Sequence, residues 1–402
     1  MNLRHRFEAR RPADPARNPR QRTVPGMLVV ALAVAGVAVS TSARARPATA
    51  SGVTPGDPRT TCTSGWQVQR RSGTPGALVA VAAAGAGDAW AVGSVGFGVP
   101  TRTLAMRWDG ADWTVVASPN PSSMLDVLNG VAVLSARDAW AVGGAGAMSG
   151  ITLSSLIEHW NGTGWTVVRA RGPQELEAVV ALSPSDIWAV GNSNVTSAAG
   201  PATTSSMHWT GTRWVSVPTV DPGAFNALST LARIPRTDQL WAGGSTTARS
   251  GGTGPAGINP TPLIERWTGT RWTVVATPDI HGQVLGIAAT GPADAWAVGE
   301  KDGAGGRIVP LVLHWNGQRW AQLPLPSPKA GLTAVVAPSV DDVWAVGNGT
   351  ILHFDGTSWR TSPWPSPSGA TLDGIGQARG SVWAVGWWDA AQPRPLVVAS
   401  CS

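Results

Sequence analysis

Apolar and polar positions beyond the first 60 residues follow a short, repeating pattern. Compact runs rich in Val, Ile, Leu and Trp, such as LVAVAAA at 78–84, SLIEHW at 155–160 and WTVV at 165–168, are separated by segments rich in Gly, Asn, Asp and Pro. Such runs predict β-strands, and tight turns such as N-G-T-G at 161–164 predict hairpins between them. The pattern therefore predicts an all-β chain of many short antiparallel strands.

The pattern recurs at intervals of 39 to 55 residues. Each unit carries the string D-x-W-A-V-G or a weaker copy of it. A run of small apolar residues comes before the string. A variable loop, a third run and a tight turn come after it, followed in three units by the segment W-T-V-V (113–116, 165–168 and 272–275). Four antiparallel strands repeated at this period are typical of β-propeller blades. The tryptophans of the string are Trp90, Trp140, Trp188, Trp241, Trp296, Trp344 and Trp383.

We therefore predict a seven-bladed β-propeller of four-stranded antiparallel blades. Small residues such as VAVAAA at 79–84 suit the first strand of a blade, beside a narrow central channel. The tryptophans belong further out, where adjacent sheets face each other. Of the 22 tryptophans, 19 fall at repeat positions, and we interpret these 19 as core residues and not as a cluster that binds a ligand. Phe354 takes the third-strand aromatic position in the sixth unit.

The two ends of the repeat region supply complementary parts of one blade. The seventh unit ends at PLVVAS (395–400) without a fourth strand, whereas Trp66 opens a segment that matches the fourth-strand pattern. We predict 3+1 closure between the termini, which removes a free sheet edge. Cys62 and Cys401 both map to the turn that joins the third and fourth strands, so we predict a Cys62–Cys401 disulfide. Catalysis by a free thiol is the alternative interpretation.

The first 50 residues have the layout of a secretory leader. An arginine-rich start is followed by the uncharged apolar run MLVVALAVAGVAVS at 27–40 and by small residues, with cleavage expected near residue 45 or 50. The run is shorter than the roughly 20 apolar residues of a spanning helix, so an uncleaved anchor is the weaker alternative. The sequence does not decide between Sec and twin-arginine export. We expect an extracellular protein with a short linker at 51–61 and the propeller at 62–402.

The overall charge of +6 belongs mainly to this leader. Residues 1–50 hold nine arginines against two acidic residues, so the remaining chain has a net charge of −1. A near-neutral body without a basic run does not favour nucleic-acid binding. Tyr is absent from the chain, which excludes chemistry that needs a phenol.

The D-x-W-A-V-G strand followed by H-W-N-G-T-x-W-T-V-V resembles the tryptophan-rich propeller repeats of secreted proteins from actinobacteria and other bacteria, loosely grouped with kelch and galactose-oxidase central-domain propellers. The resemblance covers about residues 62–402 and implies the fold. The kelch glycine doublet is present only at 143–144 and 243–244, and the Gly-His element of WD40 repeats is missing. Without Tyr, neither a galactose-oxidase copper site nor a sialidase nucleophile can be carried over.

The polar residues that recur do not predict a catalytic or metal site. His159, His208, His314 and His353 share one repeat position, and equivalent positions in a ring lie too far apart to bind one ion. We interpret them as outward or blade-edge residues. The repeat aspartates, such as Asp88, precede the second strand, where we expect them to fix a turn by accepting backbone hydrogen bonds. Glu158 and Glu265 are also repeat positions. No cofactor is predicted.

The variable loops are the predicted ligand-binding region. Loops between second and third strands and connections between blades emerge on the same face of a propeller, and functional residues collect on such loops. Aromatic residues outside the repeat mark this face near the first and seventh blades. An aspartate that also lies outside the repeat follows two of them directly in the sequence. Alternatively, these aromatics cover the ends of blades six and seven. The candidates are Trp387, Trp388, Asp389, Trp364 and Phe97.

The sequence thus predicts a secreted, monomeric, non-enzymatic binding or scaffold propeller whose ligand is a glycan, a cell-wall polymer or a protein. The alternative is a secreted hydrolase or lyase with carboxylates at the channel mouth.

Overall fold

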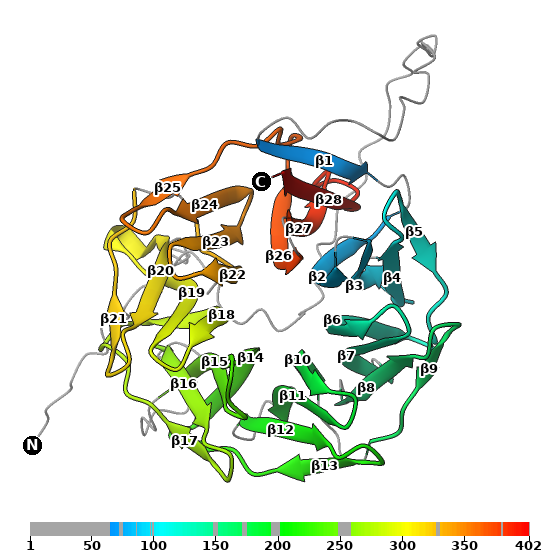
Figure 1. Ribbon diagram of the computed structural model, residues 1–402, viewed down its shortest axis with the longest axis horizontal. Helices are drawn as coiled ribbons and strands as arrows, with labels where there is room; N and C mark the ends of the chain where they lie inside the picture. The colour runs from blue at the N-terminus through cyan, green and yellow to red at the C-terminus, as the bar shows by residue number, and fades with distance from the viewer. Residues whose placement is uncertain are drawn as a thin grey trace, which may run out of the picture. The chain divides into compact units, whose positions relative to one another are not determined.

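The computed structural model describes residues 65–71, 75–85, 87–96, 98, 100–147, 152–170, 175–193, 202–247, 259–326, 330–378 and 381–401. In these ranges the chain forms 28 strands in seven four-stranded antiparallel sheets, arranged as a ring (Figure 1). This confirms the predicted seven-bladed propeller. One 3-10 turn, η2 (Ala304–Gly306), is the only helical element of these ranges, and none of their helices could cross a membrane. The predicted leader and linker lie outside the described residues.

In six blades the strands run from the centre outward in chain order. Blade one is β2 (Ala77–Gly85), β3 (Asp88–Val95), β4 (Arg102–Trp108) and β5 (Trp113–Val116), and blade two is β6 (Leu125–Ser135), β7 (Asp138–Ala147), β8 (Thr152–Trp160) and β9 (Trp165–Val167). Blade three is β10 (Glu175–Ser183), β11 (Asp186–Ser193), β12 (Thr203–Trp209) and β13 (Trp214–Val217), and blade four is β14 (Phe225–Arg233), β15 (Leu240–Thr247), β16 (Thr261–Trp267) and β17 (Trp272–Val274). Blade five is β18 (Gly282–Gly291), β19 (Asp294–Asp302), β20 (Ile308–Trp315) and β21 (Trp320–Gln322), and blade six is β22 (Ala334–Ser339), β23 (Asp342–Gly347), β24 (Thr350–Phe354) and β25 (Trp359–Thr361). Blade seven is β26 (Thr371–Ala378), β27 (Ser381–Trp388), β28 (Arg394–Cys401) and β1 (Gly65–Arg71).

The N-terminal strand completes the last blade, as predicted. β1 pairs antiparallel with β28, and Trp66 faces Ser400. In blade two the fourth-strand Trp165 faces the third-strand Trp160 in the same register. The borrowed strand therefore takes the place of a true fourth strand and leaves no unpaired outer edge on β28.

The register also places the C-terminal cysteine. Ser400 takes the position of the last third-strand residue, such as Trp160 in blade two, and Cys401 follows it and faces Gly65. The Cys401 backbone therefore lies where the turn to the fourth strand begins in the other blades. Cys62, three residues before Gly65, lies outside the described residues. The Cys62–Cys401 disulfide therefore stays a prediction.

A bulge interrupts the inner strands at one repeated place. In six of them the register shifts just after a buried Leu or Val that faces the glycine of the repeat string. A Cβ on this glycine would collide with the inner strand; at Gly191 it would lie 1.9 Å from the carbonyl oxygen of Glu175. The repeat therefore needs glycine because two backbones approach closely there. The bulge residues are Val79, Asn129, Glu177, Ser229, Leu285 and Asp373.

The repeat tryptophans join each blade to the next. The Trp90 ring centroid lies 4.8 Å from that of Trp160 and 4.8 Å from that of Trp165, both in blade two. The ring closes in the same way, since Trp383 of blade seven lies 5.4 Å from Trp113 of blade one. These tilted and edge-to-face contacts are the favoured geometries for aromatic pairs. These repeat tryptophans therefore pack between adjacent blades.

The repeat aspartates bind side chains and not the turn backbone, which corrects the interpretation from sequence. In four blades an aspartate Oδ1 lies 2.7–2.9 Å from Nε2 of the third-strand histidine. The pairs are Asp138–His159, Asp186–His208, Asp294–His314 and Asp342–His353. In blade one, Arg107 replaces the histidine and its Nε donates to Asp88 at 3.0 Å. The histidine also stacks on the second-strand tryptophan. In blade three the ring centroids of His208 and Trp188 are 4.2 Å apart.

Candidate functional site on the loop face

We use the name loop face for the side of the ring that carries the second-to-third loops and the blade-to-blade connections. Antiparallel strands place both sets on one side, because each strand reverses the direction of the previous one. The described parts of this face include the connections at 117–124, 218–224, 275–281 and 362–370 and the blade-seven loop at 389–393. The candidate Phe97 lies outside the described residues.

The blade-seven loop holds aromatic and charged groups together. Trp387 and Trp388 end β27, and Asp389 begins the turn with a φ of 65°. The Asp389 carboxylate accepts hydrogen bonds from two backbone amides of the turn, at 3.2 and 3.4 Å. On the other side of the turn, the Arg394 guanidinium lies 5.8 Å from the Trp388 ring centroid, and its Nε lies 3.8 Å from Asp389 Oδ2. The indole, the guanidinium and the carboxylate therefore form one group.

Trp364 lies beside this loop in the connection from blade six to blade seven. Its Nε1 donates to the carbonyl oxygen of Gly349 at 2.9 Å. Trp364 and Trp388 pack against the same buried cluster between blades six and seven. Both indoles, like that of Trp387, are half-buried. The structure thus brings four of the five candidates to the adjoining ends of blades six and seven, where the aromatics also cover the core.

One of these indoles is linked to an acid on the innermost strand. Asp373, the bulge residue of β26, is hydrogen-bonded by Trp387. Burial raises the pKa of Asp373 to about 7, and the bond from Trp387 opposes the shift. Trp387 therefore orients a carboxyl group that titrates near neutral pH.

A second acidic group lies on the innermost strands of blades two and three. Glu177 is the bulge residue of β10, and Glu175 begins the same strand. Burial raises the pKa of Glu177 to about 8, and the nearby Glu175 carboxyl adds to the shift. The bulge residue of β6, Asn129, hydrogen-bonds Glu175 and donates through Nδ2 to the Leu176 carbonyl at 3.1 Å. The sequence does not reveal these residues, because a bulge is visible only in the pairing register.

Two further acids are buried between blades. Glu158 accepts a hydrogen bond from Ser118 Oγ at 2.6 Å, and Glu265 accepts one from the Val220 amide at 3.2 Å. Both side chains are fully buried, and burial raises the pKa of Glu158 to about 7 and that of Glu265 to about 8. Because solvent does not reach them, they are structural residues, as their repeat positions suggested.

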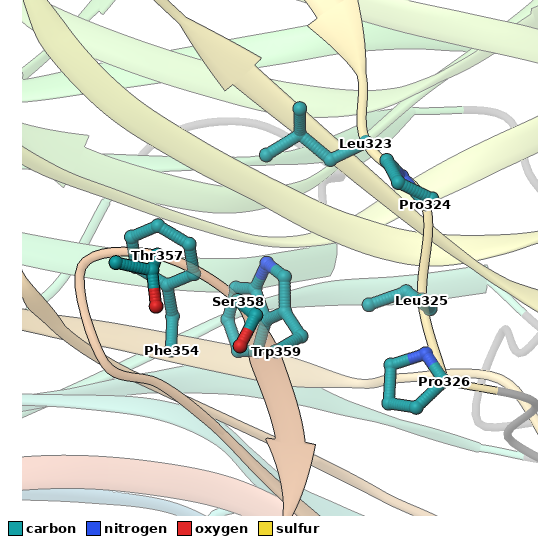
Figure 2. Close-up of a pocket in the computed structure, with 8 residues that line it drawn as sticks. All are labelled: Leu323, Pro324, Leu325, Pro326, Phe354, Thr357, Ser358 and Trp359. Atoms are coloured by element: carbon teal, nitrogen blue, oxygen red, sulfur yellow. The ribbon is translucent and has the colours of Figure 1, made fainter.

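An apolar pocket of about 310 Å³ lies between blades five and six (Figure 2). The segment Leu323–Pro326 after β21 forms one wall, and Phe354, Thr357, Ser358 and Trp359 form the other. Five other blades carry tryptophan at the position of Phe354. A phenyl ring is smaller than an indole, so Phe354 fills less of the space at this position than a tryptophan would.

Phe354→Trp is therefore expected to raise the free energy of unfolding by roughly 0.5–2 kcal/mol, the usual gain from filling a cavity. Chemical denaturation of the two proteins measures the difference. A loss of stability would mean that the indole is too large for this pocket and that the resemblance to the other blades fails here.

In the described residues, no group of three His, Cys, Asp or Glu side chains is placed to hold a metal ion.

No protein-family model matches the chain, and no curated protein matches it. Solved structures share its fold. YCF48 bound to a D1 peptide is 14% identical, with a TM-score of 0.57, covering 85% of this chain and 96% of that one. The WD40 propeller domain of Doa1 is 9% identical, with a TM-score of 0.55, covering 83% and 97%. A streptogramin B lyase is 14% identical, with a TM-score of 0.54, covering 83% and 96%. At these identities the likeness establishes the propeller fold alone.

Proposed function

We propose that this chain is a secreted, non-enzymatic binding or scaffold propeller that holds a glycan, a cell-wall polymer or a protein on its loop face. The observation that carries this proposal is the grouping of Trp364, Trp387, Trp388 and Asp389 at the ends of blades six and seven. Half-buried indoles offer apolar faces for sugar rings or apolar side chains, while their covered parts are held rigidly. The Asp389 and Arg394 charges beside them add polar contacts that can orient a ligand.

The rigidity of this group supports binding over a purely covering role. The Asp389 turn, the Arg394 contact with Trp388 and the Trp364 bond to Gly349 fix the indoles before any ligand arrives. A preorganised surface loses little conformational entropy on binding. The apolar leader at 27–40 supports export, which would expose this face to cell-wall polymers and extracellular proteins.

The experiment compares binding to a glycan array and to isolated cell walls by the mature protein and by Trp387→Ala/Trp388→Ala. We expect the double variant to lose at least about tenfold in affinity, because aromatic residues dominate such contacts. Val115→Ala, on the exposed outer strand of blade one, is the matched control and should bind normally. If the parent protein does not bind, or if the double variant binds equally well, the proposal that the ligand is a glycan or a cell-wall polymer is wrong. Co-purification from culture medium then tests a protein ligand.

The second candidate is a hydrolase or lyase, favoured by the carboxyls of Glu177 and Asp373. Both lie on innermost strands, remain partly accessible and have pKa values raised toward neutrality, as a general acid requires. Turnover of cell-wall fragments that disappears in Glu177→Gln or Asp373→Asn, while binding persists, would favour this candidate over the binding module.

A further inference from the structure

A polar group that the proposed binding surface at blades six and seven does not include lies where blades two and three meet at the innermost strands. It consists of Asn129, Glu175 and Glu177. Asn129 comes from β6, and both glutamates come from β10. The Asn129 amide donates to the Leu176 carbonyl at 3.1 Å and hydrogen-bonds the Glu175 carboxyl, so one side chain spans the two blades. This bond holds Glu175 in a fixed position.

Among the described residues, no basic side chain forms an ion pair with these carboxyl groups. Glu175 is only 4% exposed, and its Oε1 is buried without a hydrogen-bond partner. The ion pairs between described residues all lie elsewhere, and none includes Glu175 or Glu177. A buried, unpaired acceptor is costly, and a native structure usually satisfies it. The unsatisfied oxygen therefore points to a missing donor.

Solvent reaches the second carboxyl, so a ligand can approach. Glu177 is partly accessible although Glu175 is not. Its position in the bulge leaves it outside the strand pairing of β10 with β11. A group that reaches Glu177 from solvent would therefore meet Glu175 beside it.

We propose that Glu175, Glu177 and Asn129 form a binding site for the primary ammonium group of a ligand. An ammonium ion has three N–H donors and no acceptor. The site offers three acceptors for them: the carboxyls of Glu175 and Glu177 and the side-chain oxygen of Asn129, whose nitrogen already donates to the Leu176 carbonyl. The positive charge of the ammonium would also compensate two neighbouring acids. The described residues provide no third acidic or imidazole ligand here, so a metal ion is matched less well. This site is separate from the indoles of blades six and seven and does not depend on their ligand.

The test uses n-butylammonium chloride as the probe, with n-butanol plus sodium chloride as the matched neutral control. Isothermal titration calorimetry on the mature protein should detect binding of the ammonium and not of the alcohol. Glu177→Gln and Glu175→Gln should each weaken binding by roughly tenfold or more, because each removes a charge-assisted hydrogen bond. Glu265→Gln, a buried glutamate between other blades, is the control and should bind like the parent.

Proton release provides a second measurement that a purely structural role would not change. Burial and the nearby Glu175 carboxyl raise the pKa of Glu177, and binding of a cation favours the ionised form of this group, so binding releases a proton. Its titratable neighbour is Glu175. We expect affinity to rise between pH 7 and 9, and this rise to disappear in Glu177→Gln. No binding by the parent protein, an equal response to butanol, or unchanged binding in both glutamine variants would overturn the proposal. None of these results bears on Trp387 or Trp388.

Discussion

Replacing Trp90 by alanine is expected to lower the free energy of unfolding by about 3–5 kcal/mol, the range for removing a large buried aromatic side chain. Trp90 is fully buried and touches Trp160 and Trp165 of the next blade, each at 4.8 Å. Its Nε1 has no hydrogen-bond partner, so the loss reflects packing, cavity formation and the contact with the Arg107 guanidinium, which lies 5.7 Å from the Trp90 ring centroid. Urea denaturation of both proteins measures the change.

The control for this experiment is Val115→Ala. Val115 lies on the outer strand of blade one and is 58% exposed, so its truncation should change stability by less than about 0.5 kcal/mol. If Trp90→Ala were as mild as Val115→Ala, the claim that the repeat tryptophans hold the blades together would be wrong.

Breaking the predicted Cys62–Cys401 bond should lower the free energy of unfolding by up to roughly 5 kcal/mol in the chain-entropy model, because the bond would close a loop of nearly the whole propeller. The β1–β28 pairing and the contact of Trp66 with Trp344 at 5.5 Å remain without it. The protein with Cys62→Ser and Cys401→Ser is therefore expected to fold but to unfold at lower denaturant concentration.

Intact mass with and without reductant tests the bond itself. A mass gain of two hydrogens only after reduction, with the serine variant unaffected, agrees with a disulfide. Two free thiols in the exported protein would show that strand pairing alone closes the ring.

The repeat made most of the fold predictable. The D-x-W-A-V-G string identified the second strands, and the position of Trp66 predicted that β1 would complete blade seven. The units are similar in sequence because each blade packs against its neighbours through the same positions. The string's glycine was not explained from sequence, because the bulged inner strand that it admits appears only in the pairing register.

The candidate site was less predictable for the same reason. Trp387, Trp388 and Trp364 stood out because they fall outside the repeat. Glu177 and Asp373 occupy equivalent bulge positions, and the residue type differs in all six blades that have this bulge, so no periodic signal marks them. The histidine–aspartate pairs were not predicted because the two residues lie 11 to 22 positions apart in the sequence and meet only when the second and third strands of a blade pair.

Hydrogen–deuterium exchange on the mature protein, with and without the cell-wall fraction or purified partner that it binds, tests the central claim most directly. Binding on the loop face predicts slower exchange at 362–370 and 387–394. It predicts unchanged exchange in the third-to-fourth turns at 161–164 and 268–271, on the other side of the ring. Protection confined to those turns, or none at blades six and seven, would contradict the account.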